Sequence, residues 1–398
     1  MKAAANAAVV EKNDFQRKEK LKSELLKSVV FLCVFIAVFS LFAVPMGLAN
    51  ALNTMMNTAY RLLIDTTLYI MAIAVLAGAV SALFSEYGVI ELLNKILSPL
   101  MRPLFGMPGA AALGIVTTYL SDNPAILALA DDKQYRRFFK AYQIPALTNL
   151  GTSFGMGLIV TTFVLGLGGE HIGLAALCGN LGAVVGSIIS TRLMMHFTAK
   201  ALGKTQMALT ETEQECTSDN GGQVRNKGIL RVLTALMDGG KKGVELGLGI
   251  IPGVLIICSL VMMLTNNAPA GGVYTGAAYE GIGLLPAMAD KIDFLLQPLF
   301  GFSSAADIAV PVTALGSAGA ALGVIPTLLQ NGQANSNDIA VFTAMCMCWS
   351  GYLSTHVSMM DVLGCNHFTG KAILSHTIGG LLAGTVAHWL FTLLQLIL

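Results

Sequence analysis

The chain has 398 residues, of which 55% are hydrophobic and only 12% are charged, about half the charged share of a typical soluble protein. This composition excludes an ordinary water-soluble domain, and the net charge of +1 gives no sign of a nucleic-acid partner. The seven cysteines form neither a paired disulfide framework nor a metal-ligand spacing, and most lie inside apolar runs.

The first predicted element is a transmembrane helix over residues 28–49, which follows a polar stretch at residues 2–27. Its length suits the roughly 30 Å hydrocarbon core of a bilayer. A cleaved signal peptide is the alternative, because Ala49-Asn50-Ala51 has the small residues that a signal peptidase accepts, but the polar stretch is unusually long for one. We therefore expect a retained helix.

Six more apolar segments are long enough to cross the membrane, and each is expected to be helical. With the first helix they predict seven crossings (1 + 6), and the fold class is an all-α integral membrane protein. The six segments cover residues 60–84, 144–167, 172–197, 244–264, 339–363 and 372–398.

Two other apolar segments, residues 108–130 and 304–329, are broken by Ser121-Asp122-Asn123-Pro124 and by Gly316-Ser317-Ala318-Gly319. Each is predicted to be a re-entrant helical hairpin, which enters the membrane and turns back. Because lipid cannot satisfy the backbone groups at such a tip, both tips must be buried in protein or line a wet cavity.

The two halves of the chain repeat. An amphipathic segment suited to the membrane surface precedes each hairpin, at residues 90–104 and 284–299. Arg102-Pro103-Leu104-Phe105-Gly106 matches Gln297-Pro298-Leu299-Phe300-Gly301 at an offset of 195 (298 − 103), which also places Thr118 on Thr313 and Asp122 on Ser317. Each unit contains three crossings, an odd number, so the second unit is expected to be inverted relative to the first.

Lys and Arg set the predicted orientation, since they gather in cytoplasmic loops. With the N-terminus inside, the cytoplasmic side holds residues 2–27, 95–140, 192–242 and 371, and only Lys291 and the boundary residue Arg61 fall outside. We expect a multi-pass protein of a bacterial inner membrane, with its C-terminus outside. The predicted domains are residues 1–59 with the first transmembrane helix, 60–199 as repeat 1, 200–241 as a cytoplasmic linker and 242–398 as inverted repeat 2.

Polar side chains at the hairpin tips and in the crossings that follow them are the candidates for a solute site. Asp122 and Asn123 either bind a solute or cation at mid-depth or cap the helix that begins at Pro124. In the second half a polar stripe runs from Ser350 to Asp361, with Thr355 and His356 beside it. Single Ser and Thr residues can serve helix packing, but the set with His356 and Asp361 favours a cavity lining.

The complete predicted substrate-binding set is Ser121, Asp122, Asn123, Thr148, Asn149, Thr152, Ser153, Thr313, Ser317, Ser354, Thr355, His356, Ser358 and Asp361. If His356 shares a cavity with Asp122 or Asp361, its protonation would couple solute movement to a proton. Asp65 and Glu245 are expected at the membrane interface instead. The chain shows no Walker pattern, no His-Glu-x-x-His helix and no nucleophile elbow, which argues against an ATP-driven pump, a zinc site or an enzyme.

Two stretches carry a family resemblance: Asn123-Pro124-Ala125-Ile126-Leu127-Ala128, and Ile144-Pro145-Ala146-Leu147-Thr148-Asn149-Leu150-Gly151-Thr152-Ser153, with Arg136-Arg137 between them. This pattern resembles the Gate domain of nucleoside-recognition membrane proteins and of the membrane part of ferrous-iron transport protein B. The cysteines of the iron transporter's pattern are replaced here by Ser121, Asp122 and Thr152. The order of elements also resembles concentrative nucleoside transporters, whose hairpins and broken helices hold substrate and coupling ion.

The leading hypothesis is a secondary transporter that moves a small polar solute, on the resemblance a nucleoside-like one, by alternating access. It needs no cofactor other than a coupling ion, sodium or a proton, and no metal site. Its expected partners are membrane lipid and the solute, with a homo-oligomer as an option and no nucleic acid. The alternatives are an ion carrier or channel, whose oxygen ligands would bind a hard cation, and a non-transporting assembly or regulatory partner, whose hairpin tips would pack dry.

Overall fold

In the computed structural model of the protein, residues 2–131, 133–208 and 229–397 are described, with all of their side chains except those of residues 2–21, 124, 127, 128, 131, 134 and 354. Every regular element within these residues is helical. Six segments are long and apolar enough to span a membrane, which confirms the all-α membrane fold. They are Lys22–Met46, Leu48–Glu86, Ala141–Gly166, Ile172–Leu202, Ile229–Thr265 and Asn366–Gln395.

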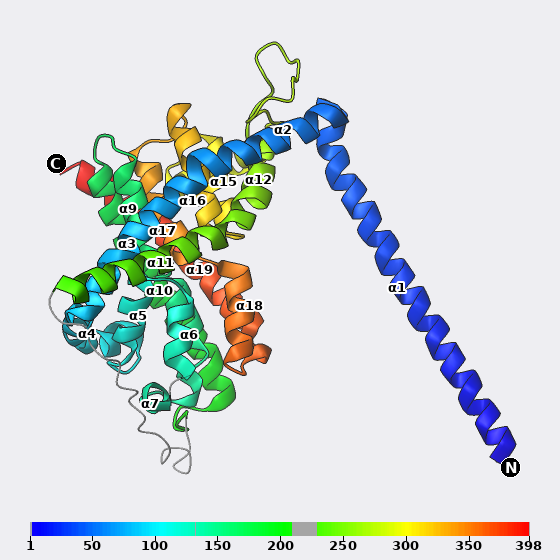
Figure 1. Cartoon of the computed structure of the whole chain (residues 1–398), viewed down its shortest axis with the longest axis horizontal. Helices are drawn as coiled ribbons and strands as arrows, with labels where there is room; N and C mark the ends of the chain where they lie inside the picture. The colour runs from blue at the N-terminus through cyan, green and yellow to red at the C-terminus, as the bar shows by residue number, and fades with distance from the viewer. Residues whose placement is uncertain (1, 132, 209–228, 398) are drawn as a thin grey trace.

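The first helix, α1 (Lys2–Met46), leaves the body of the molecule at an angle, and its N-terminus lies far from the other helices (Figure 1). Gly47, with φ 79°, makes the turn into α2 (Leu48–Arg61), a backbone conformation that glycine adopts without a steric penalty. The π-helical turn η1 (Leu62–Thr67) and α3 (Leu68–Glu86) continue α2 as one long rod.

The rest of the first repeat follows in the predicted order. An amphipathic segment, α4 (Val89–Leu100) with η2 (Met101–Phe105), leads into a hairpin whose helices have only 10 and 8 residues, too few to cross a bilayer. The elements are α5 (Ala111–Leu120), α6 (Pro124–Asp131), α7 (Lys133–Arg136), η3 (Ala141–Gln143), α8 (Ala146–Thr152), α9 (Gly157–Gly166) and α10 (Ile172–Leu202).

The second repeat has the same order. Its long rod is α11 (Ile229–Gly253), η5 (Val254–Cys258) and α12 (Ser259–Thr265), again with a π-helical turn in the middle. The amphipathic segment, the hairpin, the broken helix and the closing helix are α13 (Leu284–Ala289), η6 (Asp290–Ile292), α14 (Asp293–Phe300), η7 (Ala305–Ile308), α15 (Ala309–Ala314), α16 (Ala318–Gln330), α17 (Ser336–Cys348), α18 (Tyr352–Val362), η8 (Asn366–Phe368) and α19 (Thr369–Gln395).

Two of the predicted crossings are interrupted: residues 144–167 still lie within the span Ala141–Gly166, whereas residues 339–363 are not among the six spans, which corrects that expectation. The first breaks between α8 and α9, and the second between α17 and α18. The residue before the second half has a left-handed backbone in both cases, Met156 with φ 57° and Gly351 with φ 66°. These two residues are again 195 apart (351 − 156), so the repeat extends into the backbone geometry.

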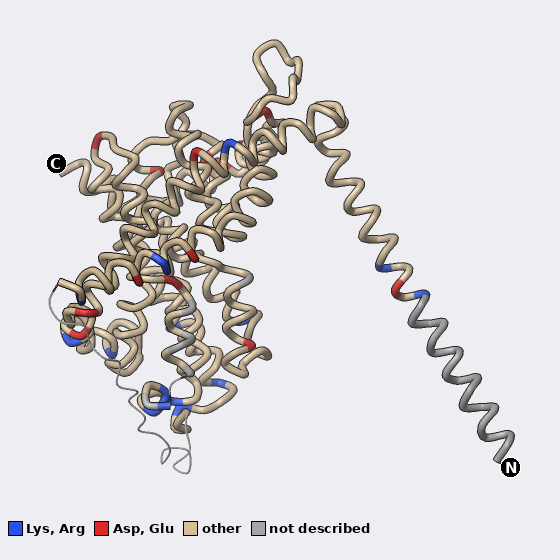
Figure 2. The backbone as a smooth tube through the Cα atoms, in the orientation of Figure 1, with Lys and Arg blue, Asp and Glu red and all other residues tan. Residues whose placement is uncertain are grey.

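The long helices of one repeat pack along those of the other, α3 along α11 and α10 along α19. In Figure 1, α5 and α6 lie in the lower half of the body and α15 and α16 in the upper half, so the two hairpins occupy opposite halves. In Figure 2, Lys and Arg gather at the end that holds α4 and α7, and the opposite end carries few of them.

The predicted linker, residues 200–241, is only partly tested. Residues 209–228 lie outside the part of the chain that the structure describes. The helix α11 already begins at Ile229, so the last part of that range is helix rather than linker.

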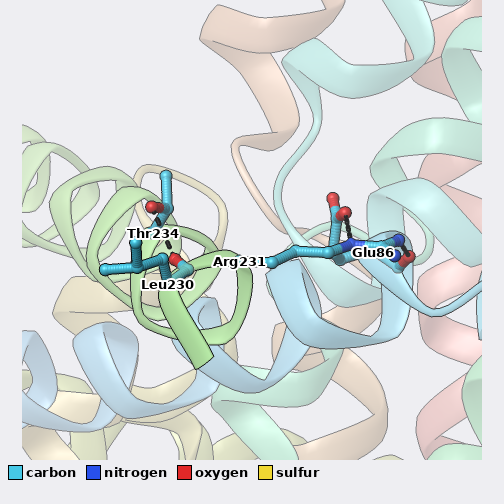
Figure 3. Close-up of polar contacts among 4 residues, drawn as sticks. All are labelled: Glu86, Leu230, Arg231 and Thr234. Carbon is cyan, nitrogen blue, oxygen red and sulfur yellow. Dashed lines mark hydrogen bonds and ion pairs between the residues drawn. The ribbon is translucent and has the colours of Figure 1, made fainter. Parts of the chain in front are cut away.

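Figure 3 shows a contact that joins α3 to α11. Arg231 donates from Nε to Glu86 Oε1 and from Nη2 to the Glu86 carbonyl oxygen (2.7 Å), while Thr234 donates to the carbonyl oxygen of Leu230 within α11 (2.8 Å). The Arg231 guanidinium also lies 5.3 Å from the centre of the Tyr87 ring. The side chains of Arg231 and Glu86 are 32% and 27% exposed, so this pair is better shielded from water than the other ion pairs on the surface.

We expect Arg231→Ala to lower the thermal midpoint of the purified protein by a few degrees, because it removes a two-point charged hydrogen bond worth about 1–3 kcal/mol. Thermal unfolding in detergent measures this effect. Lys241→Ala is the control, since Lys241 pairs with Asp238 where the two side chains are 70% and 59% exposed. Equal losses in the two variants would contradict the prediction.

The loop between α12 and α13 is fastened by one carboxylate. Glu280 accepts hydrogen bonds from Thr275 N (3.1 Å), Thr275 Oγ1 (2.7 Å) and Gly276 N (3.0 Å), and from Thr54 Oγ1 of α2 (3.4 Å). Burial alone would raise the pKa of Glu280, but the hydrogen bonds outweigh it and hold the pKa below its ordinary value.

The anchoring of this loop is expected to weaken in acid. A carboxyl group whose pKa is lower in the folded state stabilises the fold above its unfolded pKa and loses that contribution as the pH falls through the folded pKa. We expect Glu280→Gln to lower the thermal midpoint at pH 7 and to reduce the fall in midpoint between pH 5 and pH 3, the range around and below the ordinary pKa of a glutamate in which the contribution is lost. Glu170→Gln, at a side chain that is 89% exposed, is the control. A Glu280→Gln protein with the full wild-type pH dependence would show the idea to be wrong.

Candidate functional site

A cavity of about 430 Å³ lies where the two hairpin tips and the two helix breaks come together. We call it the central cavity. Each half of the chain contributes one tip and one break, and α11 supplies a wall. The lining residues are Asp122 and Asn123 from the first tip, Gly316 to Gly319 from the second, Met156, Ser350 and Gly351 from the breaks, Thr355 from α18, and Glu245, Leu246, Gly249, Ile250 and Gly253 from α11.

Asn123 fastens the first hairpin tip to the helix break of the other repeat. Its side chain is only 4% exposed, and Nδ2 donates to the carbonyl oxygen of Ser350 (2.7 Å). That carbonyl lies in the break, where it has no helical partner of its own. The Oδ1 atom of Asn123 has no hydrogen-bond partner among the described residues, which leaves a buried acceptor beside the cavity.

Asp122 stands at the junction of two cavities. One carboxylate oxygen accepts from the backbone N–H of Asn123 (2.7 Å). The side chain lines both the central cavity and a second one of about 330 Å³, the inner cavity, which Ser121 and Lys242 also line. The two cavities share Leu246 as well, so they adjoin each other at Asp122 and Leu246.

Ser317, the counterpart of Asp122 in the second repeat, caps α16 and lines the central cavity. Its Oγ accepts from the backbone N–H of Ala320 (3.2 Å). The two interpretations of a tip residue, capping and cavity lining, therefore hold together at this position.

Six of the predicted residues lie in helix packing instead of the central cavity. Asn149 is fully buried and donates to Ser190 Oγ (2.8 Å) on α10 and to two groups on α19. The hydroxyls of Thr152 and Ser153 donate to backbone carbonyls one turn back in α8, as Thr313 does in α15. The six are Thr148, Asn149, Thr152, Ser153, Thr313 and His356, all fully buried.

His356 does not face the central cavity, which corrects the predicted coupling to Asp122 or Asp361. Its Nδ1 lies 2.6 Å from the carbonyl oxygen of Tyr352, and its ring centre is 4.6 Å from that of His376. His376 Nδ1 in turn bonds Ser190 Oγ (2.9 Å). The two histidines belong to a buried network between α18, α19 and α10.

The polar stripe predicted from Ser350 to Asp361 is also corrected, because the helix break separates Ser350 from α18. Ser358 and Asp361 lie on an exposed face, where Asn366 Nδ2 donates to Asp361 Oδ1 (2.6 Å). Ser354 is on the same helix, but its side chain is outside the described set.

Asp65 and Glu245 were expected at the membrane interface, yet both line cavities. Glu245 lines the central cavity. Asp65 lines a third cavity of about 510 Å³, the outer cavity, together with Tyr69, Asn267, Tyr279 and other residues. Both acids were predicted at the interface because they lie near the ends of apolar runs. The sequence pattern does not show that α11 packs beside the hairpin tips.

The outer cavity shares no lining residue with the central one. Between them α16 packs against the two π-helical turns: a Cβ built on Gly323 would lie 3.3 Å from Thr66 Cγ2, 3.6 Å from Cys258 Sγ and 3.8 Å from a methyl of Leu62. Leu62 and Cys258 are fully buried. This close packing lies between the end of α16 that lines the central cavity and the end that lines the outer cavity.

Comparisons with known proteins find no matching family model and no matching curated protein. Solved structures do match. CNTnw in an inward-facing, substrate-bound state superposes with a TM-score of 0.55 at 14% identity, over 82% of this chain and 75% of that chain. CNTnw variants in an outward-facing and an intermediate state give TM-scores of 0.54 and 0.52 at 14% and 13% identity, over 82% and 92% of this chain and 75% and 86% of theirs.

The matching structures are concentrative nucleoside transporters. At this level of identity the likeness shows a shared fold, and it confirms the fold that the element order predicted. The role of each residue in this chain comes from its own geometry.

Proposed function

We propose that this protein is a secondary transporter that moves a small, polar, nucleoside-like solute across a bacterial inner membrane by alternating access. The observation that carries the proposal is the central cavity, where tips and breaks from both repeats converge. Tips and breaks of membrane helices are where polar groups can meet a solute, and here Asp122, Ser317 and Thr355 line the cavity beside them. The fold shared with concentrative nucleoside transporters supports the same function.

The access paths support an alternating mechanism. The central and inner cavities share Asp122 and Leu246 as lining residues, whereas the outer cavity shares none with the central one, and α16 is closely packed between these two at Gly323. This is the asymmetry of one state of such a cycle. The opposite state would require α16 to move away from η1 and η5 and the path beside Asp122 to close.

The lining fits an uncharged or cationic solute that carries hydroxyl groups. Asp122 and Glu245 are acceptors, and Ser317, Ser350 and Thr355 supply hydroxyls that both donate and accept. The same carboxylates are candidates for the coupling ion, sodium or a proton, because hard cations prefer oxygen ligands.

The proposal also includes the family relationship of the repeats, the orientation of the protein in the membrane and its partners. The two inverted repeats are Gate units related to those of nucleoside-recognition proteins and of ferrous-iron transport protein B. The N-terminus is cytoplasmic and the C-terminus outside, since Lys and Arg gather at one end of the body. Membrane lipid and the solute are the partners, and a homo-oligomer is compatible with the exposed apolar surface of α1.

Uptake into proteoliposomes tests the function. The purified protein is reconstituted, a sodium or proton gradient is imposed, and entry of radiolabelled uridine and adenosine is measured. We expect accumulation of at least one nucleoside with one gradient, and a loss of about tenfold or more in Asp122→Ala and Ser317→Ala. Thr385→Ala is the control, because Thr385 is half-buried on α19, away from the central cavity, and among the described residues its hydroxyl bonds to the carbonyl of Leu381 (3.0 Å) within its own helix.

The alternatives give different results. An ion carrier or channel would pass sodium or protons with no nucleoside dependence. A non-transporting assembly partner would give neither uptake nor ion flux, and it predicts dry hairpin tips, whereas Asp122 and Ser317 line a cavity here.

A further inference from the structure

Two buried carboxylates of the second repeat lie side by side, away from the central cavity. Asp307 belongs to η7, before the second hairpin, and Asp338 to the first turn of α17; both are 0% exposed. Neighbouring residues hold them together: Ser304 N donates to Asp307 Oδ2, while Ser303 donates to Asp338 from its backbone N–H (3.1 Å, to Oδ1) and from its hydroxyl (2.5 Å, to Oδ2). Among the described residues no Lys or Arg forms an ion pair with either of them.

Helix capping accounts for part of this arrangement. Asp307 Oδ2 accepts from Ser304 N (2.9 Å), and Asp338 Oδ2 accepts from Asn335 N (2.7 Å), each as the third residue of a capping box. Neither cap requires a negative charge, however, and two adjacent buried charges oppose each other.

The first repeat shows how the same position is capped without charge. At the offset of 195, Asp338 corresponds to Gln143 and Asn335 to Lys140 (338 − 143 and 335 − 140). The Gln143 side chain accepts from Lys140 N (2.9 Å) in the same capping geometry. Asp307 corresponds to Ala112, which has no polar side chain. The second repeat therefore carries two carboxyl groups where the first repeat caps the same positions with one amide.

One oxygen of the pair has no partner. Asp307 Oδ1 is buried and makes no hydrogen bond with the described residues. A buried carboxylate oxygen without a donor is costly, so the pair must be compensated either by a proton held on one of the carboxyl groups or by a cation from outside the chain. Ser303 and Asn335, which bond each other through Ser303 Oγ and Asn335 Nδ2 (2.5 Å), are exposed and leave the pair within reach of water and ions.

We propose that Asp307 and Asp338 form a binding site for one hard divalent cation, with calcium as the best match. A charge of +2 balances two carboxylates, and calcium accepts carboxylate, hydroxyl and water oxygens in flexible geometry. The site would tie the start of the second hairpin to the start of α17. It is separate from the central cavity and does not rest on the proposed transport function.

Calcium binding to the full-length protein in detergent tests this site. After chelator treatment, the thermal midpoint and equilibrium binding of radioactive calcium are measured at constant ionic strength, with magnesium and sodium as parallel arms. We expect one calcium per chain and a rise in midpoint of about 5 °C at a 100-fold excess over the dissociation constant. Asp307→Asn should weaken binding at least tenfold.

The first repeat supplies a variant that is expected to fold. The double substitution Asp307→Ala and Asp338→Gln installs the residues of Ala112 and Gln143, and should keep its midpoint while losing the calcium response. Asp290→Asn, at an exposed acid, should respond as the wild type does. The proposal is overturned if the wild type binds no calcium, if it responds to sodium alone, if it is stabilised only by acid, or if the double variant still binds calcium.

Discussion

Gly155→Ala is expected to reduce nucleoside uptake by about tenfold to a hundredfold while the protein remains folded. Gly155 lies in the break between α8 and α9, directly beneath the first hairpin tip. A Cβ there would overlap the Asn123 amide oxygen and lie 2.5 Å from Asn123 Cγ and 2.9 Å from Ser350 Oγ. The tip must move, and the bond from Asn123 to the Ser350 carbonyl must break.

The size of the effect follows from that bond. A buried carbonyl left without a donor costs about 1–3 kcal/mol, and each 1.4 kcal/mol is a factor of ten in an equilibrium. Proteoliposome uptake and the thermal midpoint are measured together. Gly173→Ala is the control, because a Cβ on Gly173 meets nothing within 4 Å.

A second substitution separates a clash from a general disturbance. In the double variant Gly155→Ala with Asn123→Ala the clashing amide is gone, so any loss of thermal midpoint should be largely recovered. Uptake should stay low, because the link between tip and break is still missing. Recovery of uptake in the double variant would show that Asn123 has no part in transport.

The hairpins and their tips could be predicted because polar residues interrupt apolar runs at positions where lipid could not satisfy the backbone. Asp122, Asn123 and Ser317 were predicted in this way, and Thr355 because it lies beside the polar stripe; all four line the central cavity. The offset of 195 that relates the two repeats also relates two capping boxes that were not predicted, those of Gln143 and Asp338.

The helix breaks could not be predicted from the same pattern. Residues 144–167 and 339–363 are apolar and long enough to cross, and glycine is common in intact membrane helices. Asn149 and Asn123 are both amides beside small residues, yet only Asn123 reaches the cavity. The difference depends on which helices pack against each, which is a tertiary property.

Gly182→Ala is expected to lose uptake as Gly155→Ala does, but, unlike Gly155→Ala, together with a large loss of stability. Gly182 lies where α10 crosses α19, and a Cβ there would be 2.5 Å from the carbonyl oxygen of Ala383 and 3.0 Å from Ala387 Cβ. A backbone carbonyl cannot turn away as a side chain does, so the two helices must separate.

The equivalent crossing of α3 and α11 is built in the same way, with a Cβ on Gly78 lying 2.5 Å from the carbonyl oxygen of Gly239. Both crossings join a helix of one repeat to a helix of the other, so they form the frame against which the hairpins are placed. Separating the helices costs about 1–3 kcal/mol by overpacking alone, and more where close contacts along the crossing are lost as well.

Thermal unfolding and uptake of the Gly182→Ala protein show whether the two helix crossings stay rigid while the hairpins move. Gly370→Ala is the matched control in α19, because its Cβ meets nothing within 4 Å. If the frame is rigid, Gly182→Ala lowers the midpoint far more than Gly155→Ala does, although both impair uptake. If Gly182→Ala instead impaired uptake at an unchanged midpoint, the crossing of α10 and α19 would itself move during transport.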